Sequence, residues 1–326
     1  MLYLVTGGAG FIGSHLAEEL LRRGERVRVV DDLSTGRRQN LNHLNGVEFV
    51  EGDLADLPLA RRVTAGVDYV LHQAAIPSVP RSIEDPIGSH RANVDATLNV
   101  LVAARDARVR RLVYAGSSSV YGDAPGLPKS EGMPTHPLSP YALQKLMGEA
   151  YAELFAALHG LETVTIRYFN VFGPRQDPSS PYSGVISLFI RALLEGRSPT
   201  IHGDGEQTRD FTYIDNVVDG VLRACTKPAS GLSINVATGG RISINRVFER
   251  LCGLIGAFVE PTYGPPRAGD VRDSQADITL AHTILGYRPI VPLEEGLVRT
   301  IAWFRAEQRG SHTLKSWPAE HRIAES

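Results

Sequence analysis

The sequence predicts a doubly wound α/β fold with a mostly parallel sheet, and three observations predict it. Short runs rich in Val, Ile and Leu alternate with helical patterns through the first half of the chain. These runs are almost continuously apolar, which is typical of strands covered on both faces. A glycine-rich turn, TGGAGFIG, separates the first run from the first helical pattern. Strand–helix alternation at this spacing favours a parallel sheet with helices on both sides.

Six strands and three helices are expected in this first half. The predicted strands are LYLVT at 2–6, VRVVD at 27–31, VEFVEGD at 47–53, VDYVLHQAA at 67–75, RLVYAGS at 111–117 and TVTIRYFNV at 163–171. The predicted helices run from about Phe11 to Arg23, from Pro86 to Ala107 and from Pro140 to His159.

The pattern loosens after Gly173, where proline and glycine recur. Later elements are expected as helices at about 185–195, 211–225, 244–256 and 293–305 and as a short strand at 233–239. This mixture suits a smaller C-terminal α/β domain built largely from insertions after the sixth strand. The predicted division is a dinucleotide-binding domain at 1–172 with a return at about 209–240, a substrate domain at about 173–208 and 241–310, and a mobile tail at 311–326.

Composition narrows the functional classes. The 326 residues carry a formal charge of −2, which gives no reason to expect nucleic acid or membrane as a partner. Cys225 and Cys252 are too far apart for a metal-knuckle spacing, and they are expected to be buried thiols, so no metal site is predicted. The N-terminal apolar run is short and lacks a basic flank, unlike a signal peptide, so a reduced, cytoplasmic protein is expected.

The glycine turn predicts a dinucleotide site because its context is right. Gly8, Gly10 and Gly13 match G-x-G-x-x-G, after a strand and at the start of a helix. Asp31 follows about 20 residues on, where a carboxylate accepts from the adenosine ribose hydroxyls and repels a 2′-phosphate. NAD is therefore favoured over NADP, although Arg37 and Arg38 lie close by in sequence. A glycine loop that serves only a tight turn is the simpler alternative.

A second constellation predicts alcohol oxidation. In SPYALQK, Tyr141 and Lys145 are four residues apart and share one helix face. An ammonium beside the phenol is expected to lower its pKa, so that the tyrosine can take a proton from an alcohol. Ser117 ends the fifth predicted strand, where a hydroxyl can relay that proton. A surface Tyr–Lys pair and a polar serine turn are the simpler alternatives.

With these residues the chain resembles the extended short-chain dehydrogenase/reductase family, and within it the UDP-glucose 4-epimerase group. The resemblance extends to about Arg305 and rests on TGGAGFIGSHL, VVDDLSTG, HQAA, AGSSSVYGD, SPYALQK, RYFNVFGPRQ, HGDGEQTRDFTYIDN and RAGDVRDSQAD. It implies a Rossmann fold, bound NAD and Ser117, Tyr141 and Lys145 as the catalytic residues. It also implies an NAD site formed by Gly7, Gly10, Phe11, Ile12, Gly13, Asp31, Asp32, Leu33, Ser34, Thr35, Gly36, Asp53, Leu54, Gln73, Ala74, Ala75, Asn93, Tyr141, Lys145, Tyr168 and Val171. As a lone residue, Asp53 could equally cap a helix.

The same resemblance implies that the second domain grips a UDP-sugar. Arg209 and Arg267 are the expected diphosphate ligands, since guanidinium groups suit phosphate oxygens. Asp270 is expected at the uridine ribose, and Thr200 to His202 along uracil. The full implied substrate set is Ser78, Arg81, Ser117, Ser118, Tyr141, Asn170, Val185, Thr200, Ile201, His202, Arg209, Arg267, Asp270 and Ser274.

The implied reaction is 4-epimerisation through a transient 4-keto sugar. Related dehydratases and decarboxylases carry acids just after the catalytic hydroxyl, where this chain has Ser118 and Ser119. Ser274 matches a position that gates the sugar 2′-substituent, and a serine there predicts room for UDP-N-acetylglucosamine as well as UDP-glucose. UDP-glucuronate 4-epimerase, with Arg81 at the carboxylate, stays open, as do another dehydratase or reductase and a non-enzymatic NAD sensor. The two long helices imply a homodimer through a four-helix bundle.

Overall fold

The computed structural model describes residues 1–178, 184–266 and 271–309. Its centre is a parallel sheet of seven strands among these residues, in the order β11-β6-β5-β4-β1-β2-β3. The strands are β1 (Leu2–Thr6), β2 (Arg26–Asp31), β3 (Val47–Glu51), β4 (Tyr69–His72), β5 (Arg111–Ser117), β6 (Glu162–Tyr168) and β11 (Leu232–Val236). The predicted strands and their parallel arrangement are confirmed, and the strand at 233–239 extends the same sheet.

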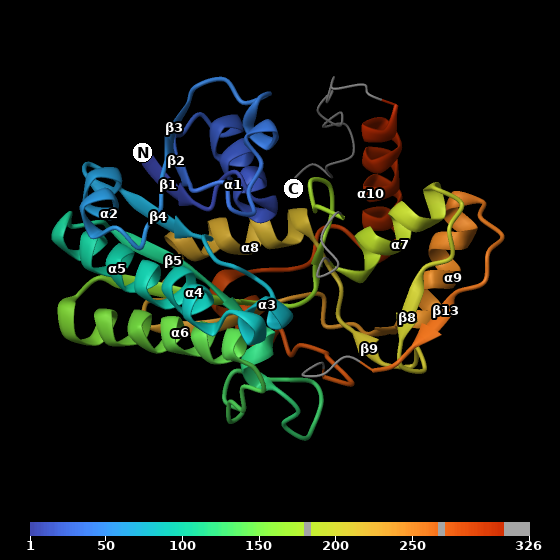
Figure 1. Cartoon of the computed structure of the whole chain (residues 1–326). Helices are drawn as coiled ribbons and strands as arrows, with labels where there is room; N and C mark the ends of the chain where they lie inside the picture. Colours follow the sequence, from blue (N-terminus) through green and yellow to red (C-terminus); the bar gives the residue numbers. More distant parts are fainter. Residues whose placement is uncertain (179–183, 267–270, 310–326) are drawn as a thin grey trace, which may run out of the picture.

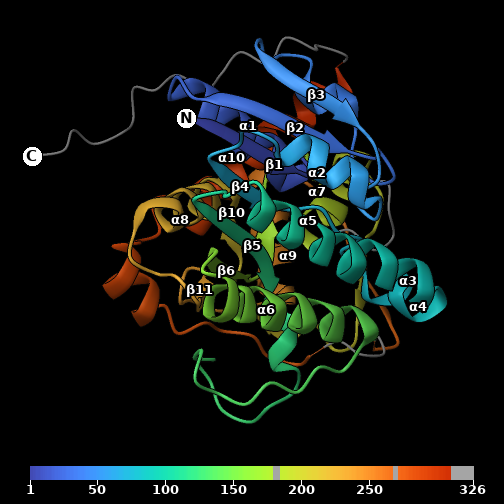
Figure 2. The ribbon, with the colours of Figure 1, turned by 90° about the vertical axis from the view of Figure 1, so that its left-hand side faces the viewer.

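Helices cover both faces of this sheet (Figures 1 and 2). One face packs against α1 (Phe11–Arg22) and α8 (Ile214–Thr226), which also contact each other. The other face packs against α2 (Leu57–Thr64), α5 (Ala96–Asp106) and α6 (Pro140–His159). The predicted doubly wound fold is therefore confirmed, and strand order reverses between β1 and β4, where such folds bind ligands.

The predicted helix 86–107 is built from three pieces. A helix α4 (Pro86–His90) leads into a π-helical segment η2 (Arg91–Asp95), which continues as α5. Two further helices, α2 and α3 (Val79–Glu84), have no counterpart among the predicted elements. Both are short and begin with proline in their first turn, and helices of this length depend on tertiary packing.

Much of the described chain after β6, other than α8 and β11, forms a smaller lobe that lies beside the carboxyl ends of the strands (Figure 1). Its elements are β7 (Val171–Phe172), α7 (Val185–Leu194), β8 (Thr200–His202), β9 (Thr208–Arg209), β10 (Thr212–Tyr213), β12 (Ile242–Ser243), α9 (Ile244–Ile255), β13 (Thr262–Gly264) and α10 (Leu293–Gln308). A π-helical segment η4 (Ala281–Leu285) packs instead against α8 and β11. Phe189 of α7 and Phe248 of α9 meet edge-to-face at 5.9 Å between ring centres. The predicted tail from 311 lies outside the described residues.

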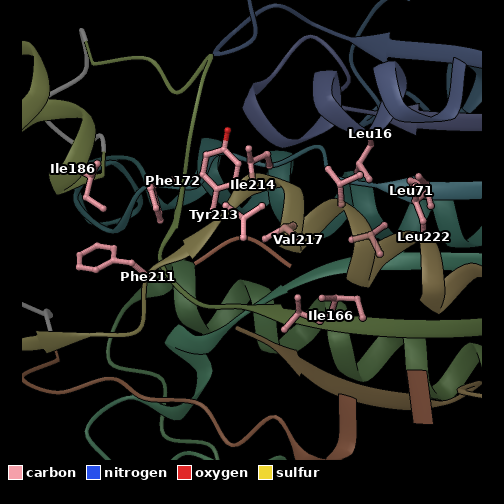
Figure 3. Packing of buried hydrophobic residues seen from close by; sticks show 14 of the residues in the cluster. Leu16, Leu71, Ile166, Phe172, Ile186, Phe211, Tyr213, Ile214, Val217 and Leu222 are labelled. Carbon is pink, nitrogen blue, oxygen red and sulfur yellow. The ribbon is translucent and has the colours of Figure 1, made fainter. Parts of the chain in front are cut away.

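The sheet and the lobe share one apolar core. Leu16 of α1 and Leu71 of β4 belong to the same buried cluster as Ile186 of α7 and Phe211 before β10. Figure 3 shows this continuity, with Phe172 and Tyr213 between the two ends. Since the cluster is unbroken, the lobe is fixed against the strand ends rather than joined by a linker. No described helix is long and apolar enough to cross a membrane.

Both cysteines are free thiols. Cys225 is buried in α8, and burial raises its pKa to about 12. Cys252 is only half-buried in α9, so the prediction of two buried thiols is correct for the first alone.

Candidate active site

The site is a cavity of about 850 Å³ at the carboxyl ends of the strands, between the sheet and the lobe. Its walls come from the turns that follow β1, β2, β3, β4, β5 and β6. Nearly all the predicted cofactor residues line it, although they are scattered from Gly7 to Val171 in the sequence. The parallel topology brings them together, because every strand ends at the same edge.

The glycine turn is a cradle that side chains would fill. Gly7 has φ +62°, and a Cβ added to it would lie 2.8 Å from the Cα atom of Ala74. A Cβ on Gly13 would lie 2.3 Å from the carbonyl oxygen of Gly7. Gly10, the N-cap of α1, has no capping side chain, and the first turn of α1 holds no acidic residue. Backbone N–H groups and the helix dipole therefore face the cavity at this end, which fits a pyrophosphate.

Asp31 ends β2 and faces the same cavity. Its carboxylate accepts hydrogen bonds from the N–H groups of Ala9 and Leu33, both at 2.9 Å. Burial raises its pKa, and these backbone bonds act in the opposite direction. The neighbouring arginines have other partners, since Arg37 pairs with Asp177 at 2.5 Å and Arg38 lies 4.3 Å from the ring centre of Phe49. The ribose end thus presents a carboxylate, which favours NAD over NADP.

One predicted cofactor residue differs from expectation, and another makes an ion pair that was not predicted. Asp53 lines the cavity and pairs with Arg91 at 2.8 Å, and it is not the helix cap, because α2 starts at Leu57 after Asp56. Asn93 is a correction: it is 1% exposed and does not line the cavity. Its side chain accepts from the N–H of Ile76 at 2.7 Å, so it supports the loop after β4 from behind.

Gln73 carries an unpaired donor at the cavity. Its Oε1 accepts a hydrogen bond from the Tyr168 hydroxyl at 2.8 Å. Its Nε2 is buried and has no hydrogen-bond partner among the described residues. A buried amide donor without a partner is costly unless a ligand accepts from it. Together with the glycine cradle, it fits a dinucleotide ligand.

The predicted catalytic residues meet at the inner end of the cavity. Ser117 ends β5, while Tyr141 and Lys145 lie on the first turns of α6, which begins at Ser139 as N-cap. The Ser139 hydroxyl accepts from the N–H of Ala142 at 3.2 Å, which fixes the start of the helix. The side chains of Ser117 and Tyr141 share a hydrogen bond, and all three residues line the cavity.

The electrostatics differ from the prediction for the Tyr–Lys pair. Burial raises the pKa of Tyr141 to about 12, and the hydrogen bond from Ser117 is what opposes this rise. Burial lowers the pKa of Lys145 to about 7. Lys145 Nζ donates to the carbonyl oxygen of Ala115 at 2.9 Å and lies 5.1 Å from the ring centre of Tyr114. The expectation that Lys145 lowers the pKa of Tyr141 is therefore wrong for this arrangement.

Two serines follow Ser117, and Ser119 makes a contact that was not predicted. Ser118 lines the cavity, and Ser119 donates to Ser117 Oγ from its hydroxyl at 2.8 Å and from its N–H at 3.2 Å. Sequence reasoning also missed Tyr121 and Lys129, which line the cavity. The VYG motif was the available signal for Tyr121, whereas nothing in the sequence marked Lys129.

The predicted sugar-nucleotide residues fall into three groups. Ser78, Arg81, Ser118, Asn170, Arg209 and Ser274 line the main cavity together with Ser117 and Tyr141. Val185, Thr200, Ile201 and His202 line an adjoining cavity of about 230 Å³ that shares Asn170 and Arg209 with the first. Arg267 and Asp270 lie outside the described residues.

Arg209 is the best-placed cation between the two cavities. It is 7% exposed, and its Nη1 donates to the carbonyl oxygens of Thr208 and Arg272, each at 2.9 Å. These bonds hold the guanidinium in place while it lines both cavities. A fixed guanidinium at this junction suits a phosphate group.

Comparison with known proteins agrees with this site. Residues 3–237 match the NAD dependent epimerase/dehydratase family. The UDP-glucose 4-epimerase of Mycolicibacterium smegmatis is 43% identical over 310 residues, which are 94% of this chain and 99% of that protein.

Two solved structures are similar throughout. One is the Thermotoga maritima UDP-glucose 4-epimerase with UDP-glucose, with TM-score 0.92, 39% identity and coverage of 94% of this chain and 100% of that chain. The other is the UDP-N-acetylglucosamine 4-epimerase of Methanobrevibacter ruminantium in complex with UDP-N-acetylmuramic acid, with TM-score 0.90, 38% identity and coverage of 94% and 98%. The chain belongs to the NAD-dependent epimerase/dehydratase family.

Proposed function

We propose that the chain is an isomerase that inverts C4 of the hexose in UDP-sugars and uses tightly bound NAD. The observation that carries this proposal is the placing of Ser117 and Tyr141 in hydrogen-bond contact at the end of β5, with serines instead of acids after them. The similarity to UDP-glucose 4-epimerases over nearly the whole chain supports the same reaction.

Tyr141 is the base in this reaction. Its phenolate takes the proton of the sugar 4′-hydroxyl, either directly or through Ser117, which then passes its own proton to Tyr141. NAD, when bound, accepts the hydride from C4 and returns it. Tyr141 gives the proton back to the oxygen in the reverse step, so the chain ends each turnover in its starting state. Lys145 is held on the Ala115 carbonyl and lines the same cavity.

Inversion requires the 4-keto sugar to present its other face while the nucleotide stays bound. Arg209 is the proposed anchor for the diphosphate, because it lines both cavities and is itself held by two backbone carbonyls. The nucleoside end then lies along Thr200 to His202, and the sugar lies towards Ser117. With the diphosphate fixed, the sugar can turn about its glycosidic linkage inside the larger cavity.

The residues after Ser117 favour epimerisation over the dehydration and decarboxylation reactions that start from the same kind of keto sugar. Elimination of water or loss of a carboxylate needs an acid or base at a second carbon of the keto sugar. Ser118 and Ser119 provide hydroxyl groups, which are far weaker acids than a carboxyl group. The Ser119 hydroxyl is also already bonded to Ser117. The keto sugar therefore has one productive route, which is reduction.

We assign both plain and N-acetylated hexoses as substrates. Ser274 is 6% exposed and lines the cavity, and its short side chain leaves room beside the sugar 2′-position. Arg81 also lines the cavity and is exposed, which places a cation where an acidic sugar would gain from it. UDP-glucuronate is therefore one of the sugars to be assayed.

The test is an epimerisation assay over UDP-glucose, UDP-N-acetylglucosamine and UDP-glucuronate without added NAD. We expect turnover of the first two, and no turnover of the acetylated sugar would overturn the role of Ser274. Tyr141→Phe is expected to lower kcat by about 100-fold or more while NAD stays bound. A variant with near-normal kcat would exclude Tyr141 as the base.

A homodimer is also part of this proposal. Leu143, Leu154 and Leu158 of α6 are 43%, 50% and 71% exposed and share one helix face. Ile83 and Ile87, on the neighbouring helices α3 and α4, are 54% and 83% exposed. Figure 2 shows α5 and α6 side by side on the face turned towards the viewer. An apolar surface of this kind is typical of a subunit interface.

A further inference from the structure

Ser117 Oγ is the centre of a small hydrogen-bond network. It accepts from the Ser119 N–H at 3.2 Å and from the Ser119 hydroxyl at 2.8 Å. It also shares a hydrogen bond with the Tyr141 hydroxyl. Ser119 belongs to the short 3-10 helix η3 (Ser118–Tyr121), so one turn of backbone sets both contacts from Ser119.

The number of lone pairs decides the direction of the bond to Tyr141. A serine hydroxyl has one hydrogen and two lone pairs. The two donors of Ser119 occupy both lone pairs of Ser117 Oγ. The hydrogen is then the group left for Tyr141, so Ser117 donates and the phenol oxygen accepts. A donor to the phenol oxygen stabilises the phenolate.

We propose that Ser119 is a positioning residue for the catalytic base: its hydroxyl orients and polarises Ser117 so that Ser117 donates to Tyr141. The polarisation follows from the chain of hydroxyls, since a hydroxyl that accepts a hydrogen bond becomes a stronger donor. Without the Ser119 hydroxyl, one lone pair of Ser117 is free. Ser117 can then accept from Tyr141, and that arrangement stabilises the neutral phenol.

Ser119 also controls when Ser117 can accept a substrate hydroxyl, and this step rests on the proposed function. The sugar 4′-hydroxyl can donate to Ser117 Oγ when the Ser119 hydroxyl has turned away and freed a lone pair. The proton then moves from the sugar to Ser117 as the Ser117 proton moves to Tyr141. No charge is left on Ser117, and Tyr141 ends as the neutral phenol.

The test is the ionisation of Tyr141 in the holoenzyme with and without the Ser119 hydroxyl. Ultraviolet absorbance of phenolate is followed against pH, and subtraction of the matching Tyr141→Phe protein isolates this group from the other ten of the chain's 11 tyrosines. For Ser119→Ala we expect the midpoint to rise by about 0.5–1 pH unit. Ser119→Thr, which keeps the hydroxyl, is expected to titrate like the wild type.

The matched control is a variant that loses a buried hydroxyl group far from Tyr141 in the sequence. Thr300→Val removes the bond from Thr300 Oγ1 to the carbonyl oxygen of Gly296 at 2.6 Å in α10, and its Tyr141 midpoint should not move. If Ser119→Ala does not hold its fold, Ser119→Cys, a weaker donor, should shift the midpoint upward by a smaller amount. An unchanged midpoint in the folded variant, or no recovery in Ser119→Thr, overturns the proposal.

The pH dependence of kcat is a second measurement, and a purely structural role of Ser119 would not change it. Below the midpoint, kcat of Ser119→Ala should fall about three- to tenfold, and it should recover at high pH. A loss that is equal at every pH would contradict the proposal. The titration needs no sugar, so it measures the role of Ser119 independently of turnover. A protein that turns over no UDP-sugar would refute the proposed function but would leave this measurement valid.

Discussion

The two glycines of the cofactor turn should respond to alanine in different ways. At Gly13, an added Cβ would lie 2.3 Å from the Gly7 carbonyl oxygen and 2.7 Å from the Gly8 Cα atom, both backbone atoms. Helix α1 would have to move by about an ångström to restore a normal contact. At Gly10, the closest atom is the Gly7 oxygen at 3.1 Å, and φ of −77° suits alanine.

These distances give different expected free energies of unfolding. Gly13→Ala should lower the stability of NAD-free protein by about 2–3 kcal/mol, because backbone atoms cannot turn aside as a flexible side chain does. For a chain of this size that is a fall in Tm of about 3–4 °C. Gly10→Ala should change Tm by less than about 2 °C, since its contact is short by only a few tenths of an ångström. Its methyl group lies in the cavity at the N-terminus of α1, so NAD affinity should fall at least about tenfold.

The assay is thermal unfolding of NAD-stripped protein, followed by equilibrium binding of NAD. Gly253→Ala is the matched control, since Gly253 is inside α9 with no atom within 4 Å of the added Cβ, and it should stabilise by about 1 kcal/mol. If Gly10→Ala bound NAD normally, the helix terminus would not be the pyrophosphate site. If Gly13→Ala kept its stability, the close packing of α1 on the turn would be refuted.

Three further predictions concern α6. Glu149→Gln leaves Arg167 buried without its ion pair and should cost about 3–5 kcal/mol by denaturant unfolding, whereas replacing both residues with Met should recover much of this loss. Burial lowers the pKa of Lys145 from 10.5 to about 7, so the unfolded chain binds more protons between these values. The stability of the wild type relative to Lys145→Met should therefore rise with pH across that window, by up to about 1.4 kcal/mol per pH unit, and a flat difference would refute the burial of Lys145. Leu154→Glu with Leu158→Glu should give a monomer by sedimentation if α6 is a dimer interface, and an unchanged sedimentation coefficient would exclude that face.

The sheet could be predicted because its physical signal is local. Buried parallel strands are continuous apolar runs, and LYLVT and RLVYAGS show this directly. Helices α2 and α3 could not be found in the same way, since eight and six residues carry little periodicity of their own. The π-helical segment η2 was missed for a related reason: its residues suit an α-helix equally well, so the sequence does not distinguish the two windings.

The site was predicted where residue type and spacing determine the geometry. Tyr141 and Lys145 share a helix face because of their separation, and Asp31 faces the glycine turn because it ends the next strand. Spacing does not determine where a long side chain ends, and Lys145 reaches the Ala115 carbonyl instead of the phenol. Lys129 comes from the loop after β5, whose path over the cavity depends on contacts with the chain near Ala276.

The proposed role of Tyr141 as the base depends on how readily its phenol ionises. With a pKa of about 12, Tyr141 is protonated at neutral pH, and Lys145 at about 7 has lost much of its charge. Both shifts have the same cause, because burial disfavours phenolate and ammonium alike. In this structure the hydrogen bond from Ser117 is the contact that favours the phenolate. A cationic cofactor bound beside Tyr141 would add a second such contact, because a positive charge favours phenolate. If Tyr141 is the base proposed above, an oxidised, cationic cofactor would favour its phenolate in the same state that would accept hydride, and proton removal would then depend on the presence of a hydride acceptor.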